Sequence, residues 1–79
     1  MIIYGTDLCP DCVACKADLE KSAIVYEYRN ITENLKFMKE FLALRDSNSI
    51  FEDARREGYI GIPAIVRDNG EVTLSWENL

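Results

Sequence analysis

Three closely spaced cysteines near the start of the chain are the residues best suited to chemistry. Cys9-Pro10-Asp11-Cys12 is a Cys-x-x-Cys motif, and Cys15 extends it to C-x-x-C-x-x-C. The separation lets Cys12 attack a mixed disulfide formed at Cys9, which releases reduced product and closes a small Cys9–Cys12 ring. Zinc sites use the same spacing, so the motif alone leaves both redox and metal chemistry open.

The residues around the motif predict a strand before it and a helix after it. Met1 to Tyr4 is a short apolar run stopped by Gly5, which is typical of a buried strand. A helix is predicted from Pro10 to about Ser22, because proline is tolerated in the first turn. Its apolar surface is expected from Val13, Ala14, Ala17 and Leu19.

This placement gives the two motif cysteines different roles. Cys9 is predicted at or beside the helix N-cap, and Cys12 lies one turn inside the helix. Unpaired backbone N–H groups and the positive end of the helix dipole favour a thiolate at Cys9. Cys9 is therefore the predicted nucleophile and Cys12 the resolving thiol, with no metal and no organic cofactor required.

The rest of the chain predicts a second strand, two helices and a hairpin. The strand is expected over Ile24–Tyr28, and a long, well-buried helix is expected from Thr32, as N-cap, to about Asp46. A short helix is expected from a Ser49–Glu52 capping box to Gly58. The closing hairpin is expected to pair Ala64–Arg67 with Glu71–Ser75 around the turn Asp68-Asn69-Gly70. Leu35, Met38, Phe41 and Leu42 share a face of the long helix.

This order predicts one α/β domain over residues 1–79. Strand, helix and strand form a right-handed parallel crossover, and the closing hairpin must extend the same sheet. The fold class is thus a four-stranded mixed sheet flanked by helices. The crevice outside the carboxyl end of the first strand, where Cys9 lies, is the expected active site.

Composition excludes several function classes. A formal charge of −5 from 14 acidic and 9 basic residues argues against a nucleic-acid surface. No apolar run approaches the roughly 20 residues of a membrane helix, and the start of the chain lacks the pattern of a signal peptide. Three cysteines do not fit a fully paired secreted framework. We expect a cytoplasmic protein with neither nucleic-acid nor membrane partners.

Two segments resemble the glutaredoxin branch of the thioredoxin superfamily, especially its short glutaredoxin-related proteins: Cys9-Pro10-Asp11-Cys12-Val13 and Gly61-Ile62-Pro63-Ala64. The resemblance implies a thioredoxin-like, glutaredoxin-type fold whose C-terminal helix is shortened or absent here. It implies a cis bond at Ile62-Pro63, close to the two cysteines, and backbone groups of Ile62 offered to the substrate. The substrate-binding residues expected from the resemblance are Pro10, Asp11, Ile62 and Pro63.

The chain departs from the family's sequence pattern in the two segments that hold glutathione. Thr6-Asp7-Leu8 stands in place of a lysine before the first cysteine, and Ser75-Trp76-Glu77 replaces a Gly-Gly turn after the last strand. Trp76 is expected to cover the sheet edge left by the missing helix. The predicted partners are a disulfide-bonded protein or low-molecular-weight thiol as substrate, with a reductase or another thiol as electron donor.

Two other functions stay open at this stage. A metal or iron–sulfur module would use Cys9, Cys12 and Cys15 but lacks a fourth cysteine or histidine ligand. The default interpretation of Cys15 is a packed thiol. A non-catalytic module would use the groove beside Pro63 to bind a peptide. Asp7 and Asp11 are either surface charges or groups that disfavour the Cys9 thiolate and stabilise the disulfide.

Overall fold

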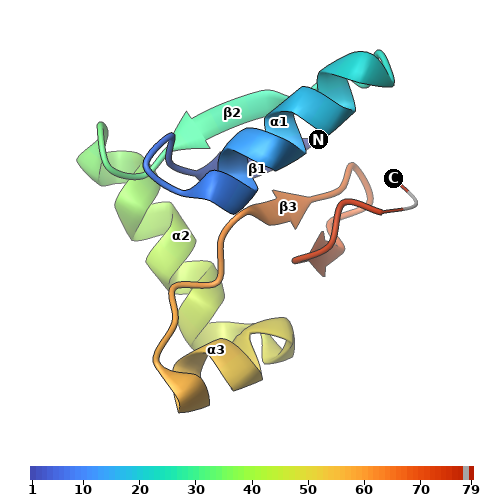
Figure 1. Cartoon of the computed structure of the whole chain (residues 1–79). Coiled ribbons are helices and arrows are strands. Elements are labelled where there is room, and N and C mark those ends of the chain that lie inside the picture. Colours follow the sequence, from blue (N-terminus) through green and yellow to red (C-terminus); the bar gives the residue numbers. More distant parts are fainter. Residues whose placement is uncertain (78) are drawn as a thin grey trace.

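The computed structural model describes residues 1–77 and 79 (Figure 1). In chain order the elements are β1 (Ile2–Gly5), α1 (Pro10–Lys21), β2 (Glu27–Asn30), α2 (Leu35–Ser47), the 3₁₀ turn η1 (Ser49–Phe51), α3 (Glu52–Glu57), β3 (Ala64–Val66) and β4 (Val72–Thr73). This is the predicted order of a βαβ unit, then helices, then a hairpin.

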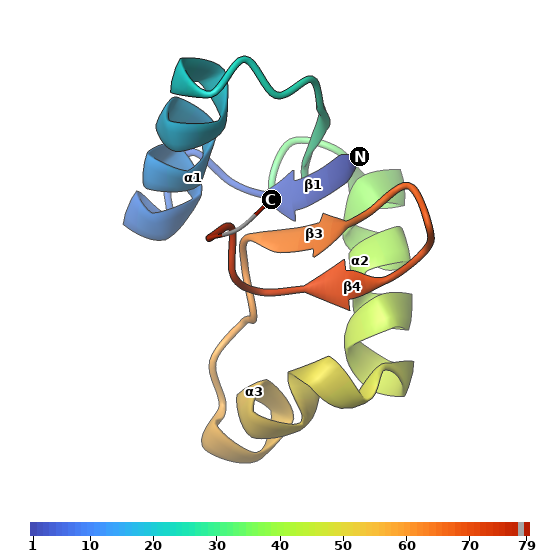
Figure 2. The same cartoon turned by 90° about the vertical axis from the view of Figure 1, so that its right-hand side faces the viewer.

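The four strands form one mixed sheet in the order β2-β1-β3-β4. Strand β1 pairs with β2 in parallel and with β3 antiparallel, and β3 pairs antiparallel with β4. Figure 2 shows β3 and β4 as the closing hairpin. Because β1 is an inner strand, the loop that follows it leaves the sheet between its neighbours, at the carboxyl end of β1. The predicted parallel crossover and four-stranded mixed sheet are confirmed.

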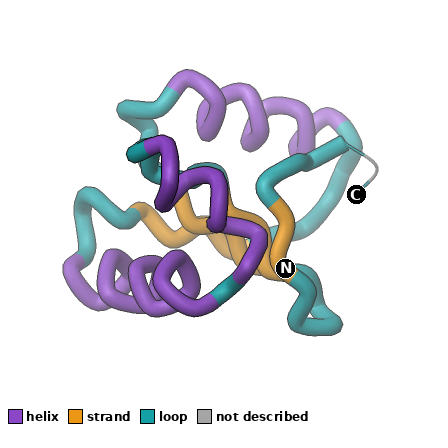
Figure 3. Tube along the Cα trace, turned by 90° about the horizontal axis from the view of Figure 1, so that it is seen from below, coloured by secondary structure: helices purple, strands orange, loops and turns teal. Residues whose placement is uncertain are grey.

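Helices cover both faces of the sheet. Helix α1 lies on one face, whereas α2 and α3 lie on the other, as Figures 2 and 3 show from two directions. Successive strand residues point to opposite faces, so neighbouring positions of β1 serve different cores. Ile3 packs with Cys15, Leu19 and Ile65 under α1. On the other face Tyr4 packs with Ile31, Phe41, Phe51, Ala54 and Ala64.

The buried face of α1 differs from the predicted one. Its buried residues are Cys12, Cys15 and Leu19, whereas Val13, Ala14 and Ala17 are exposed. A reduced cysteine behaves as a small apolar residue, and these three positions recur at helical spacing. The cysteines, rather than the alanines and valine, therefore form the core side of this helix.

The second strand begins three residues later than predicted. Ala23 adopts a positive φ of 56° just after α1, and Val25 is 89% exposed. Pairing starts where the Glu27 N–H donates to the Met1 carbonyl oxygen over 2.9 Å. Residues 24–26 carry the chain from the helix back to the sheet, so their apolar character reflects packing of Ile24 and Tyr26 beside α1 rather than strand pairing.

Both predicted N-caps after β2 are wrong. Asn34, not Thr32, caps α2 by accepting the Phe37 N–H at 3.2 Å. Asn48, not Ser49, accepts the Ile50 N–H at 3.0 Å and starts η1, so no Ser49–Glu52 capping box forms. An asparagine can cap as well as a serine or threonine; Asn34 lies two residues after Thr32, and Asn48 directly precedes Ser49. The predicted C-cap at Gly58 is confirmed by its φ of 80°.

Helix α2 is also less buried than the sequence predicts. Phe41 is its one fully buried side chain within the described chain, whereas Leu35 is 71% and Leu42 42% exposed. Leu35 stands in the first turn of α2, and Leu42 lines a hollow of about 280 Å³ between α2 and the segment that contains Tyr59 and Ile60. The helix therefore rests on the sheet along a narrow stripe.

Beyond β4, residues 74–77 and 79 form no helix. Trp76 is half-buried and packs against the cluster under α1. Its indole N–H donates to the Asp18 carboxylate at 2.9 Å. These contacts agree with the packing role expected for Trp76. No helix within the described residues is both long and apolar enough to cross a membrane.

Candidate active site

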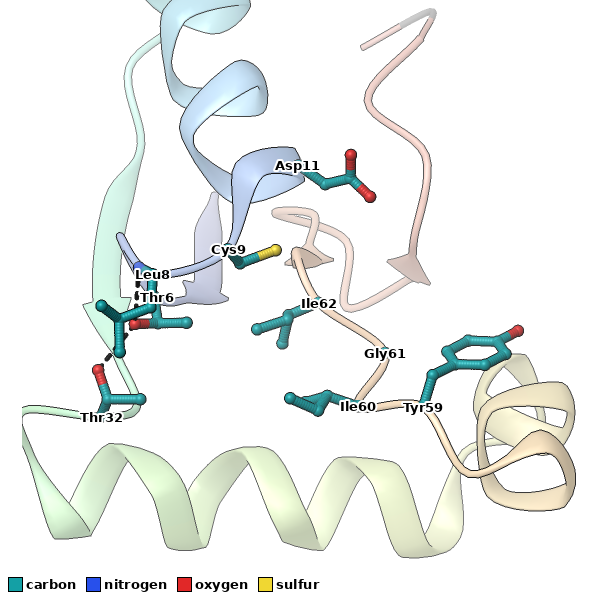
Figure 4. A pocket seen from close by; sticks show the side chains of 9 residues that line it. All are labelled: Thr6, Leu8, Cys9, Asp11, Thr32, Tyr59, Ile60, Gly61 and Ile62. Atoms are coloured by element: carbon teal, nitrogen blue, oxygen red, sulfur yellow. Dashed lines mark hydrogen bonds between the residues drawn. The ribbon is translucent and has the colours of Figure 1, made fainter.

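Cys9 lies at the N-cap of α1, as predicted. Its backbone is extended, with φ −100° and ψ 118°, and its carbonyl oxygen accepts the Val13 N–H at 3.1 Å. The side chain caps no backbone N–H group, and the residue is half-exposed. In Figure 4 its sulfur points from the start of the helix toward the segment that contains Ile62. This sulfur can therefore meet a disulfide approaching from solvent.

Cys12 lies behind Cys9 and is fully buried. Burial raises the pKa of the Cys12 thiol to about 12; the backbone N–H of Thr6 acts in the opposite direction, and a hydrogen bond with Cys9 raises the pKa further. Both residues are free thiols. At neutral pH Cys12 therefore keeps its proton, while the more accessible Cys9 is the thiol that a substrate can reach.

A groove of about 620 Å³ opens directly at Cys9 (Figure 4). Its lining residues are Thr6, Leu8, Cys9, Asp11, Thr32, Tyr59, Ile60, Gly61 and Ile62. They come from the loop after β1, the start of α1, the turn after β2 and the segment between α3 and β3. Leu8, Tyr59 and Ile60 expose 83%, 50% and 55% of their surface. The groove is therefore mainly apolar, with Asp11 as its acidic residue.

Side-chain hydrogen bonds hold the two walls of the groove. On one wall the hydroxyls of Thr6 and Thr32 lie 2.8 Å apart, and Thr6 Oγ1 also accepts the Leu8 N–H at 3.3 Å. On the other, the Arg45 guanidinium donates to the carbonyl oxygens of Tyr59 and Ile60 at 2.8 and 2.9 Å. The guanidinium is thus occupied by backbone groups of the wall.

The peptide bond between Ile62 and Pro63 is cis, which confirms the predicted geometry of this step. Gly61 precedes it with a φ of 91°, and a Cβ there would come within 2.8 Å of the Phe51 ring. Glycine is therefore required at this position for two reasons, the backbone conformation and the close approach of the ring. The buried aromatic side chain and the groove segment are thus packed as one unit.

The structure places three of the predicted site residues, Cys9, Asp11 and Ile62, on the same groove. Pro10 is exposed in the first turn of α1, and Pro63 is buried before β3. Sequence reasoning missed Leu8, Tyr59 and Ile60. Their signal was the presence of large apolar residues in loops, next to the motif and next to Gly61, where a core role is uncommon.

A family model described as Glutaredoxin matches residues 1–70, which include the cysteine motif and the cis proline. The chain belongs to the glutaredoxin family. An uncharacterized protein of Haemophilus influenzae is 35% identical over 78 residues, covering 99% of this chain and 91% of that protein. No solved structure matches the chain. The resemblance drawn from the two motifs is therefore confirmed, together with the thioredoxin-like fold.

Cys15 occupies a different environment from Cys9 and Cys12. It is fully buried among Ile3, Leu19 and Ile65, and burial raises the pKa of its thiol to about 11. In the part of the chain that the structure describes, no three His, Cys, Asp or Glu side chains are grouped so as to hold a metal ion. The geometry therefore favours the packed-thiol interpretation of Cys15.

We expect Cys15→Ala to leave disulfide turnover within a few-fold of the parent protein. Its sulfur lies in the core, and a thiol–disulfide exchange cycle needs only two cysteines. The lost packing is expected to cost about 1 kcal/mol of unfolding free energy. Steady-state reduction of a model disulfide and urea unfolding measure the two effects, with Val13→Ala on the exposed side of α1 as control. Loss of activity or of a bound metal would restore the cluster interpretation.

Proposed function

We propose that this chain is a thiol–disulfide oxidoreductase that reduces disulfides through Cys9 as nucleophile and Cys12 as resolving thiol. The observation that carries the proposal is the contrast between a half-exposed Cys9 at the helix N-terminus and a buried Cys12 one turn inside the helix. Membership of the glutaredoxin family supports redox activity in general. A thiolate is the reactive form of a cysteine, and helix N-termini favour it.

In the first step the Cys9 thiolate attacks one sulfur of a disulfide lying in the groove. The substrate S–S bond breaks, the departing sulfur takes up a proton, and a mixed disulfide with Cys9 forms. In the second step the Cys12 sulfur attacks Cys9, the second substrate thiol leaves, and the proton lost by Cys12 balances the one that this thiol gains. The substrate has gained two electrons, and the protein holds a Cys9–Cys12 disulfide.

The surface of the groove favours an uncharged, apolar stretch of substrate. Leu8, Tyr59 and Ile60 offer apolar contacts beside Cys9, and the backbone at Ile62 is available to an extended segment. The lining holds the carboxylate of Asp11 and no lysine or arginine. We therefore propose a disulfide in a protein or peptide as the substrate, in the cytoplasm, with a reductase or another thiol returning Cys9 and Cys12 to the reduced state.

Reduction of a model protein disulfide tests the activity directly. The purified protein should catalyse it when supplied with a dithiol reductant, and should show neither visible absorption nor bound zinc or iron. Catalysis without metal supports the oxidoreductase. A stoichiometric metal that is lost together with Cys12 would support the metal module instead, and peptide binding without turnover would support a non-catalytic module.

We expect poor glutathione-dependent turnover compared with turnover driven by a thioredoxin-reductase system. Glutathione carries two carboxylates, which need cations or free N–H groups directed at them. The lysine nearest the motif, Lys16, pairs with Asp7 at 3.1 Å, and the Arg45 guanidinium is bonded to the groove wall. The charge of −5 also disfavours approach of an anion.

Two coupled assays on one disulfide substrate measure this preference. One supplies glutathione and its reductase, and the other a thioredoxin-reductase system, at matched reducing equivalents. Asp11→Asn provides a matched variant. Removing the carboxylate from the groove should raise the rate in the glutathione assay more than the rate in the thioredoxin-reductase assay. A clearly higher efficiency in the glutathione assay would contradict the proposed partner.

A further inference from the structure

Tyr28 carries a buried hydroxyl that takes no part in the two steps of the proposed reaction. Its oxygen has no hydrogen-bond partner among the residues that the structure describes. An unpaired buried hydroxyl has lost its hydrogen bonds to water without gaining a replacement, which lowers the stability of the fold. Such a group in a native fold needs a physical explanation. One explanation is that the hydroxyl forms its hydrogen bond only during the reaction.

The hydroxyl faces the resolving cysteine across Gly5. Tyr28 pairs with Ile3 in the sheet, so its side chain lies on the face covered by α1. A Cβ built at Gly5 would be 2.9 Å from Cys12 Sγ and 3.2 Å from the Tyr28 hydroxyl. The sulfur and the hydroxyl therefore border the same small space, and this space exists because residue 5 has no side chain.

We propose that Tyr28 is a positioning residue for the second chemical step, and that its hydroxyl donates a hydrogen bond to the Cys12 sulfur as that sulfur becomes a thiolate. The inference rests on the proposed roles of Cys9 and Cys12. A thiolate enclosed in the core needs donors, and a hydrogen bond to a charged group is stronger than one between neutral groups. Before the reaction the neutral thiol makes a weaker partner, so the hydroxyl can stand unpaired.

The surroundings of Tyr28 keep it in the donor form. Burial raises its pKa above the ordinary value for tyrosine, and the neighbouring Cys12 and Asp7 act in the same direction. The Asp7 carboxylate is a second acceptor near the hydroxyl, but it forms no hydrogen bond with it in the resting structure. The ammonium of Lys16 lies 4.1 Å from the centre of the Tyr28 ring and pairs with Asp7. The tyrosine therefore holds its proton throughout and only shares it with the sulfur. The proton that Cys12 loses goes to the departing substrate thiol, as in the balanced step above.

A symmetric aromatic disulfide separates the two steps in a single turnover. Attack by Cys9 releases a first equivalent of coloured thiolate, and resolution by Cys12 releases a second. We expect Tyr28→Phe to slow the second release roughly tenfold, which is about 1.4 kcal/mol, and to leave the first unchanged. The pH midpoint of the second release should move upward, because the Cys12 thiolate has lost a donor.

Tyr26→Phe is the matched control, since the Tyr26 hydroxyl bonds Glu20 at 3.0 Å on the exposed side of α1. It should leave both releases unchanged. Tyr28→Phe should also melt at the same or a higher temperature, because it removes an unpaired buried oxygen. An unchanged second release, or equal slowing of both releases, would overturn the role of Tyr28. A parent protein that gives no first release would instead overturn the proposed function itself.

Discussion

Cys9→Ser is expected to abolish disulfide reduction, whereas Cys12→Ser is expected to retain the first step and to accumulate mixed disulfides through Cys9. The reason is the geometry of the two thiols: Cys9 is half-exposed at the N-cap of α1, and Cys12 is fully buried behind it. Serine at position 9 removes the nucleophile altogether. Serine at position 12 removes only the thiol that would release the bound product.

Mass spectrometry after exposure to a protein disulfide measures the trapped adduct, and peptide mapping locates it. Turnover of Cys9→Ser should fall to the rate of the uncatalysed reaction, a change of several orders of magnitude. Cys15→Ala serves as a control for the loss of a cysteine as such, because its adducts and turnover should match the parent. Equal trapping through Cys9 and Cys12 would contradict the assignment of their roles.

Phe51→Ala is expected to cost about 3–5 kcal/mol of unfolding free energy. Phe51 is fully buried between α2 and the segment that forms the groove, with its ring 5.8 Å from that of Phe41 in an edge-on arrangement. It also contacts the space where a Gly61 side chain would lie. A domain of this length has about 4–12 kcal/mol of stability in all, so this change alone brings it close to unfolding.

Chemical denaturation monitored by circular dichroism measures this loss. Leu35→Ala is the control, because Leu35 is 71% exposed and its truncation should change the unfolding free energy by less than about 0.5 kcal/mol. Because Phe51 packs against Gly61, which lines the groove, activity should fall at temperatures where the variant is still mostly folded. A stable variant with full activity would show that the groove segment is held by other contacts.

The order of elements and the redox motif could be predicted from the sequence because each depends on local chemistry. A short apolar run ending at Gly5, a proline in the first helical turn and the Asp68-Asn69-Gly70 turn are local signals with one common interpretation. Gly58 at a helix C-terminus is another. These signals predict the strand, the helix and the hairpin, and together they place the cysteine pair at the start of the helix.

Other features were decided only when the elements packed together. Asn34 and Thr32 are both competent caps, and Thr32 is instead bonded to Thr6, a residue distant in sequence. The face of α1 that becomes buried depends on how the helix packs on the sheet, so Cys12 rather than Val13 or Ala14 joins Cys15 and Leu19 in the core. Competing local options of similar free energy are resolved by tertiary contacts.

The sequence by itself determined that Cys9 and Cys12 form a pair at the end of a strand and the start of a helix. The tertiary structure decided what surrounds that pair. It brings Tyr59 and Ile60 next to Cys9, and it places the Tyr28 hydroxyl opposite Cys12 across Gly5. The physical reason is that thiolate chemistry at a helix terminus is local, whereas a groove and a buried hydrogen-bond donor need side chains from elements far apart in the chain.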